Sequence, residues 1–539
     1  MKYDVIIIGG GITGLSIAYR FIDSYKKVLL IESSNKLGGK IKTIKDNKND
    51  LIYEAGAARI SENHTKTLNL IEELGLKDEL IKLPKDIDYI IDNKKREDSI
   101  FLLINNVINN YNKIKNDEET KDTIKIEDIN FFQLCIDTIG YDKAELLKNM
   151  FGYDAEFMKM NASATLELFK NDFSIDSDYF ILKNGLSQLI EKMEKLINRE
   201  NYITILKKEK LLEIYNDKSI LTDNNIYNYD NLILAIPYKE LSQINIFEDI
   251  DLLDAVESAP LLRIYAKYPT NDGEVWFKNI KRTITNNYIR HIIPIDYKKG
   301  LIMISYMDSE YAEMWNDSII SNNKSVIGRL HKEIKTLFKI EPPEPEYIKY
   351  YYWSDGLHVW KPGYNPQKLY KEMLKPFEDE LIFVCGDSFS LKQGWIEGGL
   401  ETSYDVLEKL EIEDISFNRN LEKEEETTEN NINKSSPNNL YNIYDVIKKK
   451  TWVVIELDKK YIFDLSNWID KHPGGEWAIE RMIESNKYYI KEGKDEKYPI
   501  KPIDLFKTGK GASIHKSKDV LNRYFKKENE YVKKVGILI

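Results

Sequence analysis

Apolar residues at the start of the chain are grouped into short runs that glycines separate. The first run, residues 3–8, ends at a cluster of glycines, and a segment with a helical pattern follows. A second apolar run covers residues 28–31 and ends at Glu32. Short apolar runs bounded by glycine are typical of buried strands. The order strand, glycine turn, helix and strand predicts the opening of a doubly wound α/β fold.

The rest of the chain divides by its pattern into longer regions. Residues 76–175 have a mostly helical pattern, and residues 202–237 return to strand-like runs. Residues 260–360 also carry strand-like runs, including 301–306 and 347–353. Residues 381–410 repeat the order strand, glycine turn and helix. These patterns predict an α/β architecture that is assembled from segments far apart in the sequence.

The pattern is interrupted near the C-terminal end. Residues 413–440 are rich in Glu, Asn, Thr and Ser and poor in apolar residues, which indicates a flexible linker because too little apolar surface is available to offset ordering. Apolar residues resume at Tyr441 and continue to Ile539. The sequence therefore predicts a large region over 1–412, a linker over 413–440 and a small domain over 441–539.

Composition excludes several classes of protein. The 539 residues carry a formal net charge of −11, which argues against nucleic-acid binding. Two distant cysteines, Cys135 and Cys385, are too few for a disulfide framework or a thiolate metal cluster and fit a reducing, cytoplasmic setting. We recognise no signal peptide and no apolar run of about 18 residues, so we expect no membrane anchor.

The N-terminal glycine turn has the spacing of a dinucleotide-binding site. The first glycine permits the tight turn, the second lets the backbone approach a pyrophosphate, and the third lets helix and strand pack closely. The pyrophosphate is then bound at the helix N-terminus, and the carboxylate at the end of the next strand accepts ribose hydroxyls. The residues expected to contact the dinucleotide are Gly9, Gly11, Ile12, Thr13, Gly14 and Glu32.

Further glycine-containing segments indicate which dinucleotide is bound. They are residues 37–43, 53–59, 383–387 and 393–400. With the first turn, and in this order, they make residues 1–412 resemble the flavin-containing amine oxidase superfamily. The resemblance implies FAD-binding parts at about 1–75, 190–260 and 380–412, and substrate-binding parts at about 76–189 and 261–379.

The resemblance also implies roles for individual residues. Lys40 would face a phosphate, Asp387 would hold the ribityl chain, and Trp395 and Ile396 would lie against the isoalloxazine ring. Backbone near residues 210–211 would clamp the adenine. Residues 354–366 contain no cysteine, so the FAD is expected to be non-covalent. The remaining cofactor-binding residues that the resemblance implies are Gly39, Gly56, Ala57, Ala58 and Arg59.

The expected substrate side contains aromatic residues. Trp395 would form one wall of an aromatic cage, and the opposite wall would come from Tyr352, Trp353, His358 and Trp360, unless these residues are simply strand core. Such a cage holds an amine well, and we treat Trp395 and Trp360 as candidate catalytic residues.

Two arginines are further candidate catalytic residues. Arg59 follows a turn that resembles the substrate-carboxylate turn of L-amino-acid oxidases; alternatively, it pairs with a flavin phosphate or a structural acid. Arg263 stands where many members carry a lysine that holds a water against the flavin, and Lys267 is the alternative for that role.

The C-terminal domain contains a haem-ligand signature. Residues 472–475, His-Pro-Gly-Gly, follow strand-like runs, and residues 441–539 resemble cytochrome b5, a small α+β domain. The resemblance implies that His472 and His515 are the axial ligands of a haem b. Two axial histidines suit electron transfer rather than oxygen binding.

Three functions remain open at this point. In the first, an amine or amino acid reduces FAD, and electrons pass to the fused haem, to an external carrier or to oxygen. In the second, the flavin dehydrogenates a C–C bond, as in desaturases and porphyrinogen oxidases. In the third, the chain is a redox protein that binds its cofactors but shows little turnover.

Overall fold

The structure is a computed structural model. It describes residues 2–22, 24–120, 123–172, 177–248, 250–410, 440–441, 452–456, 460–464 and 533–538. The chain forms two compact units, Met1–Asn420 and Leu421–Ile539. Within the described residues, no helix is long and apolar enough to cross a membrane.

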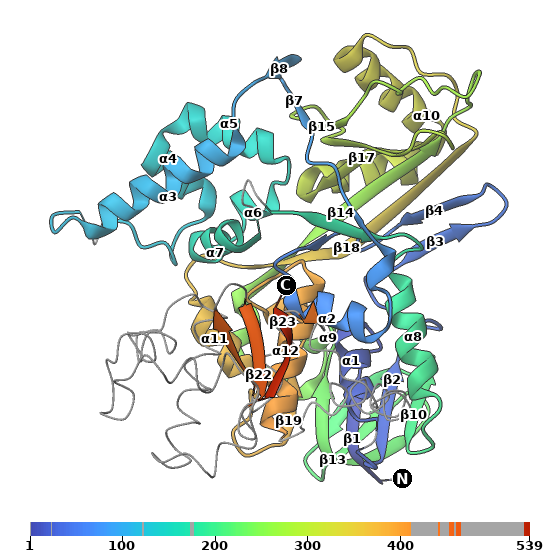
Figure 1. Ribbon diagram of the computed structural model, residues 1–539, viewed down its shortest axis with the longest axis vertical. Helices are drawn as coiled ribbons and strands as arrows, with labels where there is room; N and C mark the ends of the chain where they lie inside the picture. Colours follow the sequence, from blue (N-terminus) through green and yellow to red (C-terminus); the bar gives the residue numbers. More distant parts are fainter. Residues whose placement is uncertain are drawn as a thin grey trace. The chain divides into compact units, whose positions relative to one another are not determined.

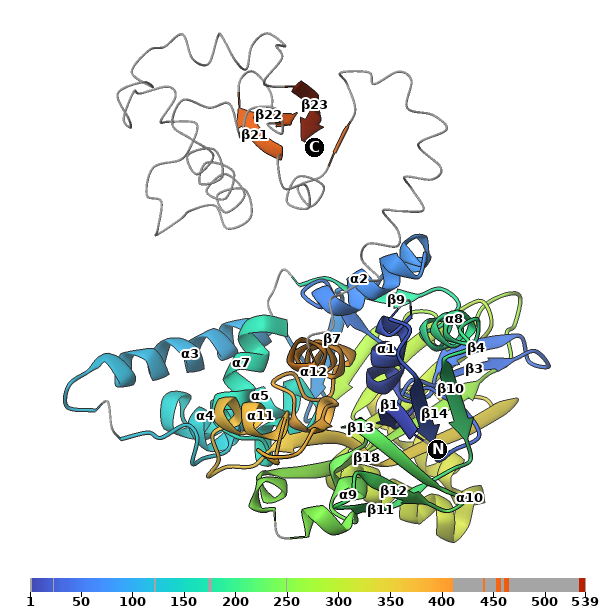
Figure 2. The same cartoon turned by 90° about the horizontal axis from the view of Figure 1, so that it is seen from below.

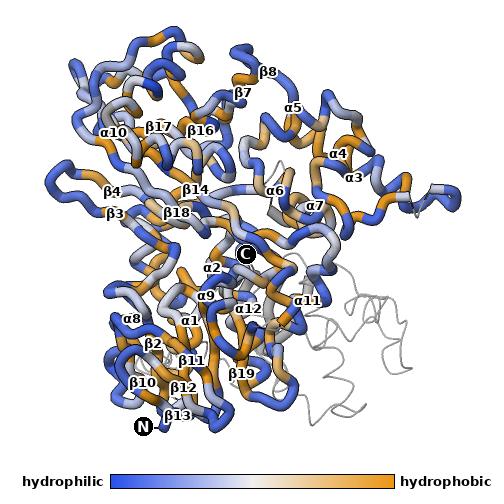
Figure 3. Tube along the Cα trace, turned by 180° about the vertical axis from the view of Figure 1, so that it is seen from behind, coloured by the Kyte–Doolittle hydropathy of each residue, from blue (hydrophilic) through white to orange (hydrophobic). Residues whose placement is uncertain are grey.

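A seven-stranded sheet forms the base of the first unit (Figure 1). Five of its strands are parallel: β10 (Ile203–Lys207), β2 (Val28–Glu32), β1 (Lys2–Ile8), β13 (Ile226–Leu234) and β19 (Ile382–Val384). An antiparallel pair, β12 (Ser219–Thr222) and β11 (Leu211–Tyr215), extends the sheet from β13. The central strands are rich in Ile, Leu and Val and are buried, as expected of a parallel sheet covered on both faces (Figure 3).

Helices that come from the two ends of the chain pack together on this sheet. Helix α1 (Ile12–Arg20) contacts both α8 (Ser187–Ile197) and α12 (Ile396–Lys409). Because β13 and β19 are adjacent in the sheet, the N-terminal turn and the last glycine motif lie at the same sheet edge. This confirms the predicted mixed α/β architecture.

A second seven-stranded sheet has the order β18-β14-β17-β16-β15-β7-β8. Its strands are β18 (Tyr347–Trp360), β14 (Val256–Lys267), β17 (Leu301–Asp308), β16 (His291–Asp296), β15 (Arg282–Thr285), β7 (Ile87–Ile91) and β8 (Lys94–Arg96). Its long strands β14 and β18 run from the first sheet to the far end of the unit, where the 30-residue helix α10 (Ser309–Phe338) packs on β14 and β17 (Figure 1). We predicted strand-like runs over 260–360 and overlooked this helix, because its buried apolar residues are separated by many polar ones.

A group of five helices forms a separate lobe beside this sheet (Figure 2). They are α3 (Ile100–Asn116), α4 (Phe131–Ile139), α5 (Tyr141–Phe151), α6 (Ala155–Met158) and α7 (Ala162–Asp172). Phe131, Phe151, Phe157 and Phe169 form the aromatic centre of the lobe. The helical prediction for 76–175 is confirmed here but is wrong for 80–96, where the chain forms three short strands.

The remaining elements are short. They are β3 (Thr43–Asp46), β4 (Leu51–Glu54), β5 (Ile60–Ser61), α2 (Thr65–Glu73), η1 (Lys77–Glu79), β6 (Leu80–Lys82), β9 (Tyr179–Leu182), α9 (Tyr238–Leu241), η2 (Asn245–Phe247), η3 (Asp251–Ala255), α11 (Pro366–Met373) and η4 (Asp387–Phe389).

The second unit contains a four-stranded sheet of order β20-β23-β22-β21. Its strands are β20 (Leu440–Tyr441), β21 (Trp452–Glu456), β22 (Lys460–Asp464) and β23 (Lys533–Leu538). Strand β22 pairs antiparallel with both β21 and β23. The predicted linker over 413–440 lies outside the described residues except for its last residue.

Candidate flavin and substrate site

A cavity of about 1230 Å³ lies in the first unit, where the predicted glycine segments meet. Residues from the N-terminal turn, both following glycine turns and the last motif line its wall. Sites for a single small molecule are typically about 300–1,000 Å³. The larger volume leaves room for a cofactor together with a substrate.

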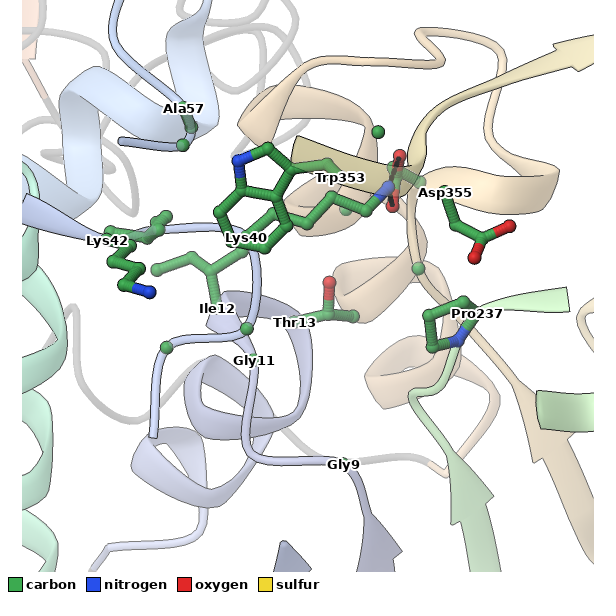
Figure 4. A pocket seen from close by; sticks show the side chains of 18 of the residues that line it. Gly9, Gly11, Ile12, Thr13, Lys40, Lys42, Ala57, Pro237, Trp353 and Asp355 are labelled. Carbon is green, nitrogen blue, oxygen red and sulfur yellow. Dashed lines mark hydrogen bonds and ion pairs between the residues drawn. The ribbon is translucent and has the colours of Figure 1, made fainter. Parts of the chain in front are cut away.

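The three glycines of the first turn meet different surroundings. A Cβ on Gly9, whose φ is +105°, would lie 2.3 Å from the carbonyl oxygen of Ala235, and one on Gly14 would lie 2.0 Å from the carbonyl oxygen of Gly9. A Cβ on Gly11 would meet nothing within 4 Å. Gly9 and Gly14 are therefore required by packing, whereas Gly11 leaves free space beside the helix N-terminus, on the cavity side (Figure 4). This space fits a pyrophosphate.

Backbone donors orient the carboxylate of Glu32 at the end of β2. The N–H of Gly10 donates to Oε2 at 2.8 Å, and the N–H of Ser34 donates to Oε1 at 2.8 Å. The carboxylate lines the cavity and retains lone pairs for further donors. Its placement fits the ribose hydroxyls of an adenosine. Lys210 and Leu211, predicted beside the adenine, line the same cavity.

Lys40 and Asp387 form an ion pair inside the cavity. The Nζ of Lys40 lies 3.0 Å from Oδ2 of Asp387 and 3.2 Å from Nδ1 of His358. Figure 4 shows the Lys40 side chain extending above the first glycine turn. Burial opposes ionisation of Asp387, but the charge of Lys40 and the contact with His358 prevail and hold its pKa well below the usual range. Burial, and then the charge of Lys40, lower the pKa of His358.

The third glycine turn is held against the second sheet by Arg263. Its Nη1 donates to the carbonyl oxygen of Glu54 at 3.0 Å and to that of Gly56, and its guanidinium lies over the Tyr306 ring at 4.6 Å. Arg263 lines the cavity as predicted, but these donors bind backbone. The alternative, Lys267, is outside the lining and pairs with Glu346 at 3.1 Å.

Arg59 is a cation in the cavity wall that has no acidic partner among the described residues. Its guanidinium carbon lies 5.6 Å from the ring centre of Tyr179 and 6.0 Å from that of Trp395. Among the described residues, no carboxylate lies within 4.0 Å of its guanidinium. The alternative that Arg59 pairs with a structural acid therefore has no support within this part of the chain.

The predicted aromatic wall is only partly formed. Tyr352 and Trp353 line the cavity, and the indole N–H of Trp353 donates to the carbonyl oxygen of Ala55 at 2.8 Å. Trp360 is placed elsewhere: it is fully buried, packs on Phe389, and its indole N–H donates to the carbonyl oxygen of Ser390 at 2.9 Å. Trp360 is therefore not at the cavity, and we no longer propose a catalytic role for it.

The first unit matches the family model described as flavin containing amine oxidoreductase over residues 12–406. The chain belongs to this family. It is accordingly a flavin-dependent oxidoreductase, and FAD is the cofactor expected for the family.

Comparisons with individual members of the family place the chain in a diverse group. It is 22% identical over 482 residues to the uncharacterized protein R188 of Acanthamoeba polyphaga mimivirus, and the aligned region covers 76% of this chain and 94% of that protein. It is 38% identical over 72 residues to mouse L-amino-acid oxidase, covering 13% of this chain and 11% of that enzyme. It is 26% identical over 162 residues to protoporphyrinogen oxidase of Dictyostelium discoideum, covering 28% of this chain and 29% of that enzyme. The two named enzymes are thus matched over less than a third of their length.

A solved structure supports the fold of this chain. The cyclohexylamine oxidase of Brevibacterium oxydans has a TM-score of 0.59 to the chain, at 15% identity, with 76% of this chain and 99% of that chain covered. At this identity the similarity concerns the fold. The family match ends before the predicted haem domain, and His472 and His515 lie outside the described residues.

Two glutamates of this family member were not singled out as site residues from the sequence. Glu397 on α12 is fully buried and accepts hydrogen bonds from the backbone N–H groups of Lys66 and Thr67 and from the Thr67 hydroxyl. It therefore caps α2 from a distant segment. The motif at 393–400 contains Glu397, but nothing local indicates which helix it would cap.

Glu156 lines the cavity from the short helix α6. Burial, together with the neighbouring charges of Asp308 and Asp154, raises the pKa of Glu156 to about 8. No local pattern singles out this residue, because an acid at the start of a short helix ordinarily faces solvent.

Proposed function

We propose that this chain oxidises an α-amino acid or a related amine, and that Arg59 binds the substrate carboxylate. The observation that carries the proposal is the guanidinium of Arg59, which lines the cavity beside Trp395 without an acidic partner among the described residues. A carboxylate accepts two parallel hydrogen bonds from such a group. An unpaired guanidinium in a substrate cavity therefore favours an anionic substrate.

The bound flavin would supply an acceptor for a hydride from the carbon that carries the amine. The protein's part is to orient the substrate. Arg59 fixes the carboxylate end, Trp353 and Trp395 bound the cavity with flat apolar faces, and Arg263 holds the backbone of the turn that ends at Arg59. Binding at fixed points aligns the reacting C–H bond and excludes water.

The proposal is tested by anaerobic reduction of the FAD-loaded protein with L-amino acids, monoamines and polyamines. We expect the flavin absorbance to bleach with at least one amino acid. Arg59→Ala should raise the KM for that amino acid about 10- to 100-fold, because hydrogen bonds to charged groups contribute about 1.5–3 kcal/mol. Bound FAD and the KM of monoamines should not change.

The exposed Arg329, which donates to Ser318, provides the matched control, since Arg329→Ala removes the same charge far from the cavity lining. Loss of FAD from Arg59→Ala would place Arg59 on the cofactor instead. Failure of every amine and amino acid to reduce the flavin would overturn the proposed reaction.

We further propose that electrons leave through a haem b held by His472 and His515 in the C-terminal domain. The support is the sequence signature at 472–475 and the resemblance of 441–539 to cytochrome b5. A linker of about 28 residues would keep such a domain at about millimolar effective concentration. Oxygen or an external carrier is the alternative acceptor.

The haem proposal has its own test. The purified chain should give the absorbance of a pyridine haemochrome, and His472→Ala should abolish it while retaining FAD. Substrate-driven haem reduction should proceed at a rate constant that is independent of protein concentration. A protein that binds no haem when haem is supplied would overturn this part and leave the amine oxidation standing.

Dehydrogenation of a C–C bond is the second candidate. The segment that matches protoporphyrinogen oxidase favours it. Reduction of the flavin by a porphyrinogen, with no response to amines or amino acids, would select this reaction.

A further inference from the structure

One carboxyl oxygen of the half-buried Glu156 has no hydrogen-bond partner among the described residues. Its Oε2 atom is shielded from solvent, and no donor in the structure reaches it. Glu156 lines the cavity together with Tyr153, whose hydroxyl is also buried without a partner. Buried polar atoms are nearly always hydrogen-bonded, so two such atoms in one cavity wall indicate a ligand that would satisfy them.

The other acids near Glu156 are occupied by the protein itself. Oδ1 of Asp308 accepts from the N–H of Asp154 at 3.0 Å, and Oδ2 accepts from the N–H of Ala155 at 2.7 Å. Asp154 forms an ion pair with Arg290 at 2.9 Å. Asp308 and Asp154 therefore hold the start of α6 in place, and Glu156 is the acid of this group that lines the cavity and keeps one oxygen without a partner among the described residues.

The charges around Glu156 favour a cation. Asp308 adds negative charge beside Glu156, Asp154 adds less because Arg290 pairs with it, and the positive charge of Arg59 only partly offsets them. Arg59 lies close enough to influence Glu156 but does not form an ion pair with it. The cavity wall thus presents a guanidinium and a carboxyl group as separate binding points.

We infer that Glu156 binds a second, non-reacting cationic group of the substrate, so that the preferred substrate is a dibasic compound such as an amino acid with a basic side chain. The inference rests on the proposed function. Oxidation withdraws electrons from the C–N bond, which a nitrogen that is already positive opposes. A group kept charged by Glu156 is therefore not the reacting amine. Arg59 and Glu156 would bind the two ends of the substrate.

The experiment compares matched substrates with the FAD-loaded full-length protein. L-Lysine and L-norleucine have the same carbon chain and differ in the terminal ammonium group. We expect the wild-type protein to show a kcat/KM at least 10-fold higher for L-lysine. Glu156→Gln should lower that ratio about 10- to 100-fold through the KM for L-lysine and leave L-norleucine unchanged. Glu240→Gln, at an exposed acid on the same cavity, is the control.

A pH profile gives a second readout. The charged groups that act on Glu156 are Asp308, Asp154 and Arg59, and Arg290 pairs with Asp154 in the same cluster. Because the cation pairs with the ionised carboxylate, the ratio of kcat/KM for the two substrates should rise with pH towards about 8 in the wild type and stay flat in Glu156→Gln. Taking the ratio cancels titrations that affect both substrates.

The outcomes separate the inference from the proposed function. If no amine or amino acid reduces the flavin, the proposed function fails. If both substrates react equally well and Glu156→Gln changes neither, the inference alone is overturned. An equal loss with both substrates would also overturn it, since it would assign Glu156 a structural role. If Glu156→Gln does not fold, Glu156→Asp, which keeps the charge but withdraws it, must reduce the preference for L-lysine.

Discussion

The ammonium group of Lys40 lies 3.0 Å from Oδ2 of Asp387, although the two residues are 347 positions apart in the sequence. The pair joins the second glycine turn to the strand–helix junction after β19. From the sequence we expected Lys40 at a phosphate and Asp387 at the ribityl chain. Their proximity places these two expected contacts side by side in the cavity.

Lys40→Met should weaken FAD binding about 10- to 100-fold. The substitution removes a cation that lines the cavity and leaves Asp387 beside an anionic cofactor. Charged hydrogen bonds contribute about 1.5–3 kcal/mol, and every 1.4 kcal/mol or so is about tenfold in affinity. The Kd is measured from the quenching of flavin fluorescence on titrating apoprotein. Lys278→Met removes a lysine from a surface pair with Glu274 and should leave the Kd unchanged; equal affinities for both variants would contradict the role of Lys40.

Two glycines of the first turn should respond differently to the same substitution. Gly11→Val places its side chain in free space beside the cavity, so the apoprotein should fold with an unchanged melting temperature but retain little FAD. Gly14→Val would drive its Cβ into the carbonyl oxygen of Gly9, 2.0 Å away, so we expect loss of folded protein. Thermal unfolding of apoprotein and the flavin-to-protein absorbance ratio distinguish the two effects. A destabilised Gly11→Val apoprotein would show that Gly11 serves packing rather than cofactor approach.

Local signals indicated which segments of the cofactor side would meet in the structure. Strand β2 covers the predicted apolar run and ends at Glu32 as expected, and the predicted residues Gly11, Glu32, Lys40 and Asp387 line one cavity. These positions are specified by short segments whose geometry depends on nearby glycines. The order of these segments along the chain was sufficient to indicate their convergence.

The substrate side was predicted less well, because its residues depend on tertiary contacts. Trp360 and Trp353 lie on the same strand, yet only Trp353 lines the cavity. Glu156 faces the cavity because Asp308, on a distant strand, holds the start of α6. Neither relation leaves a pattern in the local sequence.

Glu397→Gln should destabilise the first unit by about 1–3 kcal/mol. The carboxylate accepts two backbone N–H groups at the start of α2, with Oε1 2.9 Å from the N–H of Lys66 and Oε2 2.8 Å from that of Thr67. A glutamine amide has one oxygen, so its NH₂ group would face one of these donors and leave it buried without an acceptor. Thermal unfolding of the apoprotein measures the change. The exposed Glu408 lies on the same helix, and Glu408→Gln should leave the melting temperature unchanged; equal melting temperatures for both variants would contradict the capping role of Glu397.

As pH rises, the free energy of unfolding of the wild-type chain should fall relative to that of the Glu156→Gln variant. Glu156 keeps its proton in the folded state up to about pH 8, whereas the unfolded chain releases it near the ordinary pKa of 4.5. Between these values the folded state binds more protons than the unfolded state, so its free energy of unfolding decreases by up to about 1.4 kcal/mol per pH unit.

Glu156→Gln lacks this titration, which makes the comparison specific. The melting temperature of the variant should exceed that of the wild type by a margin that widens from pH 5 to pH 8, in the absence of substrate. Glu240→Gln removes an exposed carboxylate and should show a constant difference over the same range. A margin that narrows with pH would mean that Glu156 is ionised in the folded apoprotein. In that case a partner for its carboxylate is already present in the chain, and the cation site inferred above would be occupied by the protein itself.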